Sequence, residues 1–261
     1  MVLKSKSAII TGSTSGIGLG IAHALAKEGV NVVINGFGQR DEIEDERLEL
    51  EKTYQVKAIY SQADISKPQE IREMVKTAEK AFDVVDILVN NAGIQHVQPI
   101  DEFPDEKWDA IMAINLSSNF HAIKACVPGM KKRKWGRIIN VSSVHGVIAS
   151  PYKAAYVSAK HGVVGLTKVA ALDLAPFGIT ANAICPGYVD TPLVRKQIPA
   201  QAKEYKISES EVIEKVLLKD QFIKEFVNVQ DLGAMTVFLC SDAARMLTGQ
   251  ALCIDGGWTA H

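Results

Sequence analysis

The sequence lacks the features of a secreted, membrane-embedded or nucleic-acid-binding protein. Its 29 Lys and Arg residues are balanced by 30 Asp and Glu, giving a formal net charge of −1, so no basic surface for nucleic acid or an anionic membrane is expected. No apolar run approaches the roughly 20 residues that a membrane span needs. The N-terminal apolar run is too short for a signal peptide and leads directly into a predicted strand. We therefore expect a cytoplasmic protein without nucleic-acid or membrane partners.

Cysteine is scarce, and its spacing excludes the common zinc motifs. The four cysteines form no CxxC pair, and none has a histidine at metal-ligand spacing. Three lie in apolar stretches, which is typical of buried free thiols in a reducing compartment. We expect neither a metal nor a disulfide. The four are Cys126, Cys185, Cys240 and Cys253.

The order of apolar segments predicts an α/β fold. Strand-like runs occur at residues 7–10, 30–34, 56–60, 87–89, 137–141, 180–184 and 251–254. Helical patterns lie between them, at about 15–28, 40–54, 67–82, 105–134, 155–177 and 229–240. Such alternation is typical of βαβ units and a buried parallel sheet. We expect a single domain over residues 1–261, a Rossmann-type doubly wound parallel sheet of about seven strands.

A charged, helical segment interrupts this alternation at about residues 190–226, between the sixth strand and the next helix. Loops at the carboxyl ends of doubly wound strands surround the ligand crevice, so we expect a helical substrate lid. A surface elaboration or a subunit contact is the alternative.

The first strand runs into a glycine-rich loop that opens a helix. Gly12 permits a tight turn, Gly16 lets backbone approach a phosphate, and Gly18 lets the helix pack closely on the strand. The helix N-terminus offers N–H groups and partial positive charge to a pyrophosphate. Hydroxyl donors can be added by Ser13, Thr14 and Ser15.

Tyr156 and Lys160 lie four residues apart in a predicted helix, which puts both side chains on one face. An adjacent ammonium is expected to lower the pKa of the phenol, making it a general acid or base. Ser143 ends the fifth predicted strand, where its hydroxyl can donate to a developing oxyanion. Ser142 competes for that role, but strand alternation favours Ser143.

Further stretches carry a family resemblance. Residues 11–18 read TGSTSGIG, Asn90-Asn91-Ala92-Gly93 follows the fourth strand, Pro186-Gly187 follows the sixth, and Asp64-Ile65 ends the third. Together with the serine, tyrosine and lysine, these motifs resemble the short-chain dehydrogenase/reductase family over essentially the whole chain. The resemblance implies a catalytic role for Asn115, which would hold a water of the proton relay.

The same resemblance implies nicotinamide cofactor binding by a larger set of residues. Asp64 would accept from the adenine amine, although an acid so close to a helix start could instead serve that helix. The full cofactor set is Gly12, Thr14, Ser15, Gly16, Ile17, Gly18, Phe37, Asp64, Ile65, Asn91, Ala92, Gly93, Tyr156, Lys160, Pro186, Gly187, Val189 and Thr191.

The choice between NAD and NADP depends on the loop after the second strand. Residues 35–38 read Asn-Gly-Phe-Gly and supply neither an acid for a ribose hydroxyl nor a base for a 2′-phosphate. Ser15 lacks the positive charge that NADP-binding relatives often carry, and Arg40 is expected to begin the next helix. We expect NAD.

The crevice residues predict a small carboxylate substrate, because polar donors and cations surround the expected reacting centre. A substrate with a long acyl chain would instead need a pocket lined by apolar side chains. Within the family, the stretches NGFG, DILVNNAGIQH, KHGVVGLTK, TANAICPG and DGGWTA resemble D-3-hydroxybutyrate dehydrogenases. That resemblance implies the D-3-hydroxybutyrate/acetoacetate reaction and a homotetramer. It also implies substrate contacts from Gln95, Ser143, His145, Lys153, Tyr156, Gln197 and Trp258.

Two departures and two alternatives accompany this prediction. Tyr188 replaces a tryptophan that is usual in those enzymes, and Pro151-Tyr152 precedes Lys153 in place of a more polar lead-in. Lys153 could be a solvated charge and His145 an ordinary loop histidine. The chain could instead act on another small hydroxy or oxo acid or a 3-oxoacyl thioester, or bind NAD(H) without catalysis.

Overall fold

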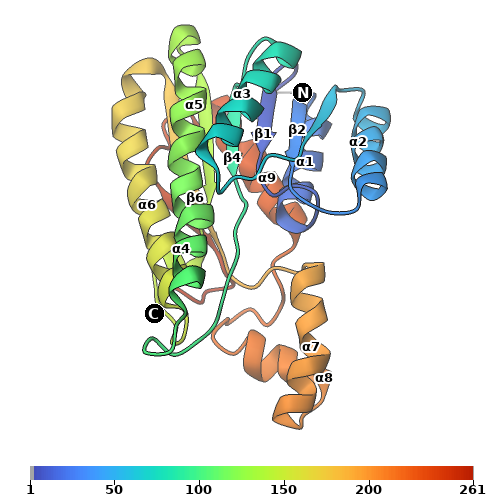
Figure 1. Ribbon diagram of the computed structural model, residues 1–261, viewed down its shortest axis with the longest axis vertical. Coiled ribbons are helices and arrows are strands. Elements are labelled where there is room, and N and C mark those ends of the chain that lie inside the picture. Colours follow the sequence, from blue (N-terminus) through green and yellow to red (C-terminus); the bar gives the residue numbers. More distant parts are fainter. Residues whose placement is uncertain (1–2, 261) are drawn as a thin grey trace.

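The computed structural model describes residues 3–260, without the side chains of Leu193, Gln197 and Glu204. Its centre is a seven-stranded parallel sheet in the order β3-β2-β1-β4-β5-β6-β7 (Figure 1). The strands are β1 Ser7–Ile10, β2 Asn31–Asn35, β3 Ala58–Ser61, β4 Ile87–Asn90, β5 Gly136–Val141, β6 Ile179–Pro186 and β7 Ala251–Ile254. All seven predicted strands and the doubly wound fold are confirmed.

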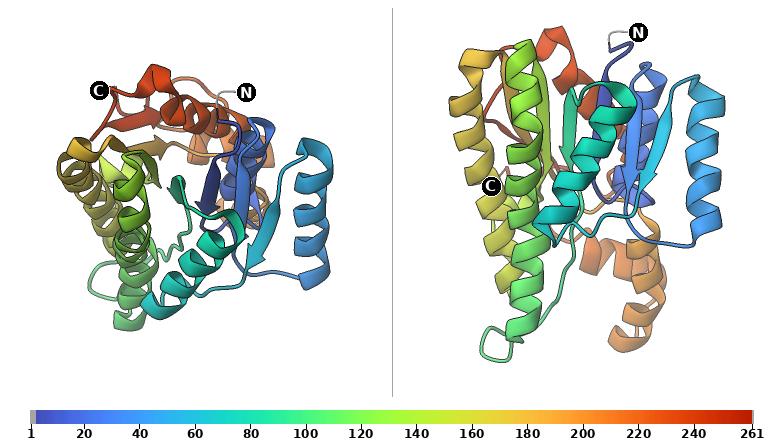
Figure 2. Two further views of the ribbon diagram at one scale, coloured as in Figure 1. Left: turned by 90° about the horizontal axis from the view of Figure 1, so that it is seen from above. Right: turned by 45° about the horizontal axis from the view of Figure 1, so that its top comes forward.

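Helices cover both faces of the sheet (Figure 2). One face is packed by α1 Gly16–Lys27, α2 Arg40–Tyr54 and α9 Val229–Cys240. The other is packed by α3 Pro68–Phe82, α5 Ser118–Arg133 and α6 Ala154–Leu174, with α4 Asp105–Met112 preceding α5. Alternate residues of one strand therefore enter different cores: Ala8 and Ile10 face α1, whereas Ile9 faces α3. This two-sided burial explains why the strands read as continuous apolar runs.

The order of the strands reverses between β1 and β4, and this position creates the ligand crevice. The chain winds from β1 outward to β3 and then crosses back to β4, so the loops after β1 and β4 diverge at their carboxyl ends. The glycine-rich loop and the Asn90–Gly93 motif follow these two strands. The fold thus brings two segments together that are far apart in the sequence.

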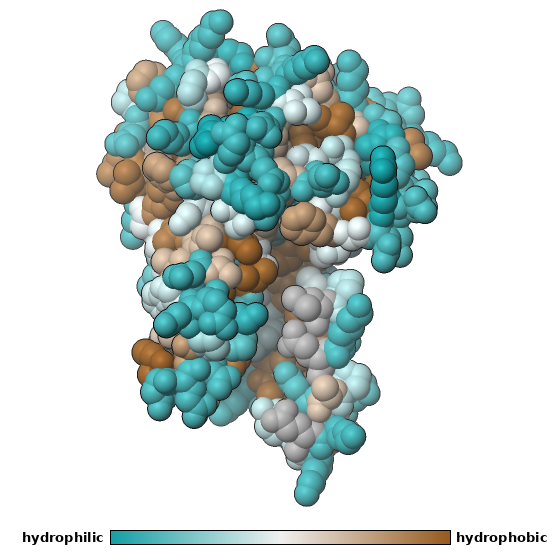
Figure 3. All heavy atoms as spheres, viewed as in Figure 1, coloured by the Kyte–Doolittle hydropathy of each residue, from teal (hydrophilic) through white to brown (hydrophobic). Residues whose placement is uncertain are grey.

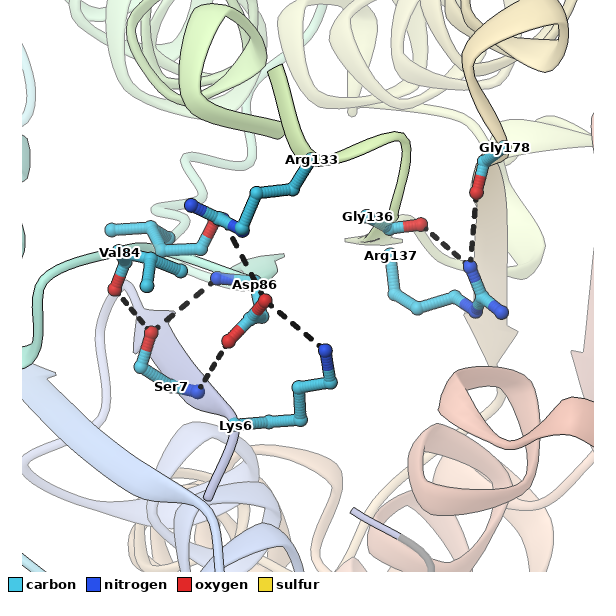
Figure 4. A network of polar contacts seen from close by, with 9 residues as sticks. Lys6, Ser7, Val84, Asp86, Arg133, Gly136, Arg137 and Gly178 are labelled. Carbon is cyan, nitrogen blue, oxygen red and sulfur yellow. Dashed lines mark hydrogen bonds and ion pairs between the residues drawn. The ribbon is translucent and has the colours of Figure 1, made fainter. Parts of the chain in front are cut away.

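The opposite end of the sheet is held by a buried carboxylate (Figure 4). Asp86, 3% exposed, accepts from the Ser7 backbone N–H at 3.1 Å. The ammonium of Lys6 at 3.4 Å and the guanidinium of Arg133 at 3.6 Å face the same carboxylate. A buried charge requires such partners. The contacts join β1, β4 and α5 at the end of the sheet away from the predicted site.

The charged segment after β6 forms an arm beside the crevice. It contains α7 Pro192–Tyr205, the short α8 Glu209–Glu211 and a π-helical turn at Val212–Leu217. A small apolar cluster around Ile198 holds it together. The arm extends below the sheet in Figure 1, and the surface is hollowed between it and the lower ends of the opposite helices in Figure 3.

One long predicted helix is interrupted. Residues 105–134 form α4 and α5 separated by a π-helical turn at Ala113–Ser117, which contains Asn115. Across residues 3–260, no helix combines the length and apolar character that crossing a membrane requires.

Candidate active site

The glycine-rich loop is built for close approach to a ligand. Gly12 and Gly16 have φ values of +63° and +56°, a region that side chains rarely adopt. A Cβ at Gly18 would collide with the carbonyl oxygen of Gly12. Ser15, the N-cap residue of α1, makes no side-chain capping bond within the described chain. The first turn of α1 is therefore a suitable cradle for a phosphate.

Two of the three hydroxyl groups of the glycine-rich loop form hydrogen bonds within the protein. Ser13 Oγ donates to the Ile10 carbonyl at 2.6 Å and accepts from Asn35 N–H at 2.9 Å. Thr14 Oγ1 donates to the Phe37 carbonyl at 3.0 Å. The hydroxyl hydrogens of Ser13 and Thr14 are donated to carbonyl oxygens, and a donor role toward a phosphate stays a prediction for these residues. Ser15 is exposed beside them.

The Asn-Asn-Ala-Gly motif after β4 locks onto this loop. Asn91 Nδ2 donates to the carbonyls of Thr11 and Gly12, both at 2.9 Å. Ala92 N–H donates to Thr11 Oγ1 at 3.2 Å. Gly93 lies against Asn115, whose Oδ1 would be 3.4 Å from a Cβ at that glycine. These contacts bring the β1 and β4 loops and Asn115 into one place.

Asp64 accepts hydrogen bonds from a residue just before α3, which agrees with the alternative that this acid stabilises the start of the helix. Its Oδ1 accepts from the Ser66 N–H at 2.9 Å and the Ser66 hydroxyl at 2.7 Å. These bonds, with Lys67 nearby, lower the pKa of the carboxyl. Ile65 beside it is buried. A role toward adenine stays a prediction.

Lys160 is tied to the end of β5. Its Nζ donates to the Val141 carbonyl at 2.8 Å, and the residue is 3% exposed. Burial lowers the pKa of the ammonium to about 8, because the charged form is poorly solvated there. Ser142 Oγ donates to the Lys160 carbonyl at 3.0 Å. Ser142 is therefore occupied beneath α6, and Ser143 is the more exposed of the two serines.

Tyr156 lies beside Lys160 and Ser143, but its pKa moves against expectation. Lys160 Nζ is 5.6 Å from the centroid of the Tyr156 ring. Burial raises the pKa of the phenol, and a hydrogen bond with the Ser143 side chain partly opposes that rise. The predicted lowering of the Tyr156 pKa is therefore wrong, because burial is the largest influence on this phenol and it raises the pKa.

Asn115 is buried in the π-helical turn, with its side-chain amide paired to one residue. Its Oδ1 accepts from Ile94 N–H and its Nδ2 donates to the Ile94 carbonyl, both at 2.8 Å. The side chain thus fixes the loop that follows Gly93. Single π-helical turns inside helices are frequent at functional sites.

A pair of basic side chains lies on the other side of Tyr156. His145 Nε2 and Lys153 Nζ are 3.1 Å apart. Burial, followed by the charge of Lys153, lowers the pKa of His145 to about 4, and burial also lowers the pKa of Lys153. The His145 ring meets Tyr156 and Trp258 edge-on, at centroid distances of 6.2 and 5.5 Å. Among the described residues, no carboxylate pairs with either base.

An aromatic stack closes this side of the crevice. Tyr188 and Trp258 are parallel within 11°, with centroids 5.7 Å apart. Tyr188 N–H donates at 2.9 Å to Oε1 of Gln221, a buried residue of the arm. Sequence reasoning missed Gln221, because it lies in no motif and its role arises only where the arm folds back on the loop after β6.

The remaining predicted site residues have few described contacts with Ser143, Tyr156 and Lys160. Gln95 is exposed on the loop after β4, and the Gln197 side chain is outside the described part of the structure. Ile17 is half-buried in α1 and Phe37 is 68% exposed. The segment after β6 carries Pro186, Gly187, Val189 and Thr191, the last of which caps α7 by accepting from Val194 N–H at 3.3 Å. Over residues 3–260 no cluster of metal-ligating side chains occurs.

The chain is similar to known proteins over nearly its full length. A family model described as enoyl-(acyl carrier protein) reductase matches residues 12–259. A D-beta-hydroxybutyrate dehydrogenase from Rhizobium meliloti is 52% identical, covering 98% of this chain and 100% of the relative. Another from Cupriavidus necator is 52% identical, covering 100% of both. A crystal structure of an actinorhodin polyketide ketoreductase variant with NADPH superimposes with a TM-score of 0.91, at 34% identity and 98% coverage of both chains.

We predict that His145 makes stability fall in mild acid. Its pKa is about 4 in the folded chain and about 6.5 when unfolded. Between these values the unfolded chain binds more protons, so the free energy of unfolding decreases as the pH falls through this window. The loss approaches roughly 3 kcal/mol at its lower end. Urea unfolding between pH 7.5 and 5 should show a flatter pH dependence for His145→Gln. His121→Gln is the control, and an equally flat profile in it contradicts the assignment.

Proposed function

This chain belongs to the short-chain dehydrogenase/reductase family of oxidoreductases, and we propose that it interconverts D-3-hydroxybutyrate and acetoacetate with NAD. The observation that carries the proposal is the His145–Lys153 pair, 3.1 Å apart beside Tyr156. A carboxylate can accept a charge-assisted hydrogen bond from the Lys153 ammonium and a second hydrogen bond from a ring N–H of His145. The reacting carbon of a 3-hydroxy acid is then separated from its carboxylate by one methylene group, which suits a site with both groups side by side.

The proposed chemistry follows from the three residues at the end of β5 and the start of α6. Bound NAD supplies the hydride acceptor. Tyr156 takes the proton of the substrate hydroxyl during oxidation and returns it during reduction. Ser143 donates a hydrogen bond to the same substrate oxygen and stabilises charge that develops there. Lys160 ties the helix that carries Tyr156 to the end of β5 through its bond to the Val141 carbonyl, and Asn115 would hold a water through which the proton reaches solvent.

The glycine turn supports a dinucleotide, and a neighbouring pocket favours NAD over NADP. A Cβ at Gly18 would fill the turn that α1 needs in order to present its N-terminus to a pyrophosphate. A pocket of about 470 Å³ lies beside Phe37 and is lined by Glu42 and Glu46, with neither Lys nor Arg among its described lining residues. Arg40 begins α2 outside that lining. A 2′-phosphate would face two carboxylates here, whereas a ribose hydroxyl would not be repelled.

Three further assignments belong to the same proposal. The arm at about residues 190–226 acts as a lid over the substrate, with Gln197 and Gln95 completing the carboxylate site. Asp64, Ile65 and the segment from Pro186 to Thr191 line the cofactor. The enzyme works as a homotetramer in the cytoplasm, as the resemblance implies, and light scattering and fractionation test these two points.

A thioester reductase is the second candidate function. A 3-oxoacyl-[acyl-carrier-protein] reductase from Staphylococcus epidermidis is 36% identical over 97% of this chain. Such an activity needs a channel for a long carrier arm. The stack of Tyr188 on Trp258 instead places a wall beside the basic pair, which favours a short free acid. A non-catalytic NAD(H)-binding module is disfavoured by the grouping of Tyr156, Lys160 and Ser143.

A substrate panel tests the proposal. Purified protein with NAD should form NADH on addition of D-3-hydroxybutyrate and not with the L acid, and should oxidise NADH with acetoacetate. Acetoacetyl thioesters, other small hydroxy acids and NADP complete the panel. Faster turnover of the thioester than of the free acid would overturn the substrate assignment.

Tyr156→Phe should lower kcat by at least about 100-fold, because it removes the general acid and base. The aromatic ring and its packing are kept, so NAD binding, followed by fluorescence quenching, should change little. Tyr152→Phe is the matched control, since Tyr152 is exposed on the preceding loop. Comparable loss of activity in both variants would contradict the role of Tyr156.

Lys153→Gln should raise KM for the acid by roughly 10- to 100-fold with a smaller effect on kcat, because it removes a hydrogen bond to a charged group. Lys168→Gln changes an exposed lysine of the same helix and is the control. An unchanged KM in Lys153→Gln would show that the carboxylate is bound elsewhere.

A further inference from the structure

Gln221 is a buried amide at the base of the arm, and its polar atoms join two segments of the chain. The side chain is 1% exposed. Its Oε1 accepts from the Tyr188 N–H at 2.9 Å, and its Nε2 donates to the carbonyls of Glu225 at 2.9 Å and Ile223 at 3.4 Å. Because the oxygen and the nitrogen both have partners, the orientation of the amide is fixed. It connects the loop after β6 to the returning end of the arm.

Two glycines leave the space that this amide occupies. A Cβ at Gly187 would lie 2.7 Å from Gln221 Oε1, and a Cβ at Gly256 would lie 3.2 Å from its Nε2. Both separations are shorter than ordinary van der Waals contact, so a larger residue at either position would displace the side chain. Gly187 follows β6 and Gly256 follows β7. The amide is therefore enclosed by the ends of two strands.

The backbone of Tyr188 is held on both sides by the returning segment. Its N–H donates to Gln221 at 2.9 Å, and its carbonyl accepts from the Val227 N–H at 2.9 Å. Val227 also forms a parallel bridge with Val189, the residue after Tyr188. One of the two bonds on the Tyr188 backbone thus depends on the identity of a side chain, and that side chain is Gln221.

The other half of the aromatic stack has its own support. Trp258 lies in a turn in which the Asp255 carboxylate accepts from the N–H groups of Gly257 at 3.0 Å and Thr259 at 2.8 Å. These bonds lie within residues 255–259, so the position of Trp258 is set largely by its own turn. Loss of the Gln221 amide should therefore release Tyr188 and leave Trp258 in place.

We propose that Gln221 is a positioning residue that sets the size of the acid the site accepts, because it holds Tyr188 against Trp258. The inference rests on the proposed function, in which this stack is a wall beside the carboxylate site. Trp258 meets the His145 ring edge-on at 5.5 Å, and His145 Nε2 is 3.1 Å from Lys153 Nζ. The wall is thus continuous with the basic pair, and a fixed Tyr188 limits acids longer than four carbons.

The expected effect is a change in substrate selectivity and not in proton transfer. Ser143, Tyr156 and Lys160 lie on other elements, the turn after β5 and α6, so kcat for the four-carbon acid should change little. One methylene group in an apolar pocket changes kcat/KM by roughly 10- to 200-fold. Loss of the Gln221 amide should raise kcat/KM for D-3-hydroxypentanoate, relative to D-3-hydroxybutyrate, by roughly 10-fold.

The test variant is Gln221→Met, which keeps the length of the side chain but cannot form its three hydrogen bonds. The N–H groups of Phe222 and Ile223 both donate to the Gly256 carbonyl at 2.9 Å, so the returning segment should stay attached. Gln221→Asn keeps an amide that is one methylene group too short, and it replaces the methionine variant if that one does not fold. Kinetics with D-3-hydroxy acids of four, five and six carbons give the selectivity.

Lys224→Met is the matched control in the same part of the arm. The Lys224 ammonium donates to the carbonyls of Leu218 and Lys219, both at 2.9 Å, so its bonds end on residues other than Tyr188. A general loosening of the arm would change the selectivity of both variants. The proposed role predicts a change in Gln221→Met and none in Lys224→Met.

A double-mutant cycle with Tyr188→Ala shows whether Gln221 acts through the ring. Tyr188→Ala alone should raise the ratio of five- to four-carbon kcat/KM, because it removes the wall. Addition of Gln221→Met should then have no further effect on this ratio, as expected of two residues that act as a unit. Additive effects, or an unchanged ratio in Gln221→Met alone, would overturn the inference.

Near-ultraviolet circular dichroism separates this inference from the proposed function. The signal of the Tyr188–Trp258 stack should be lost in Gln221→Met and in Tyr188→Ala, and kept in Lys224→Met. If the wild-type enzyme turns over none of the acids, the proposed function fails, and the dichroism alone decides whether Gln221 holds the stack. An unchanged signal in Gln221→Met contradicts that role whether or not the enzyme is active.

Discussion

A single hydrogen bond, from Lys160 Nζ to the Val141 carbonyl at 2.8 Å, sets the geometry on which the site depends. It connects α6, which carries Tyr156, to the last residue of β5, just before the turn that begins at Ser143. A second bond from Ser142 to the Lys160 carbonyl braces the same junction at 3.0 Å. Together with the packing of Ala170, Ala171 and Leu174 of α6 into the core, these two bonds set the position of the helix relative to the strand.

Burial of three basic side chains is the second constraint on the site. Lys160, His145 and Lys153 all have pKa values lowered by burial. Within the described residues no carboxylate compensates them, so an incoming acid meets donors that water does not fully solvate. Electrostatic attraction is stronger in such surroundings than in bulk water. The basic pair is therefore suited to a carboxylate ligand.

The sequence was sufficient to predict the fold, and it placed Ser143, Tyr156 and Lys160 near one another, as the structure has them. The strands, the glycine turn and the Tyr156–Lys160 spacing are local patterns, and local periodicity determines them. The uses of Ser13 and Thr14, the π-helical turn at Asn115 and the contact of Gln221 could not be predicted. Each depends on which carbonyl or amide another segment brings near, and that is decided by packing between elements.

The proposed proton-transfer residues lie at strand and helix ends, whereas the proposed substrate pocket is formed by loops. This difference explains why the type of reaction is easier to predict from sequence than the substrate. Ser143, Tyr156 and Lys160 are fixed by β5 and α6, the most regular parts of the structure. The wall beside the proposed acid site instead joins three separate segments: Tyr188 after β6, Trp258 after β7, and Gln221 in the arm. The hydrogen bond from the Tyr188 backbone to Gln221 connects the arm directly to this wall. A substitution in the arm is therefore expected to affect the stack of Tyr188 on Trp258 more than Ser143, Tyr156 and Lys160, which lie on other elements.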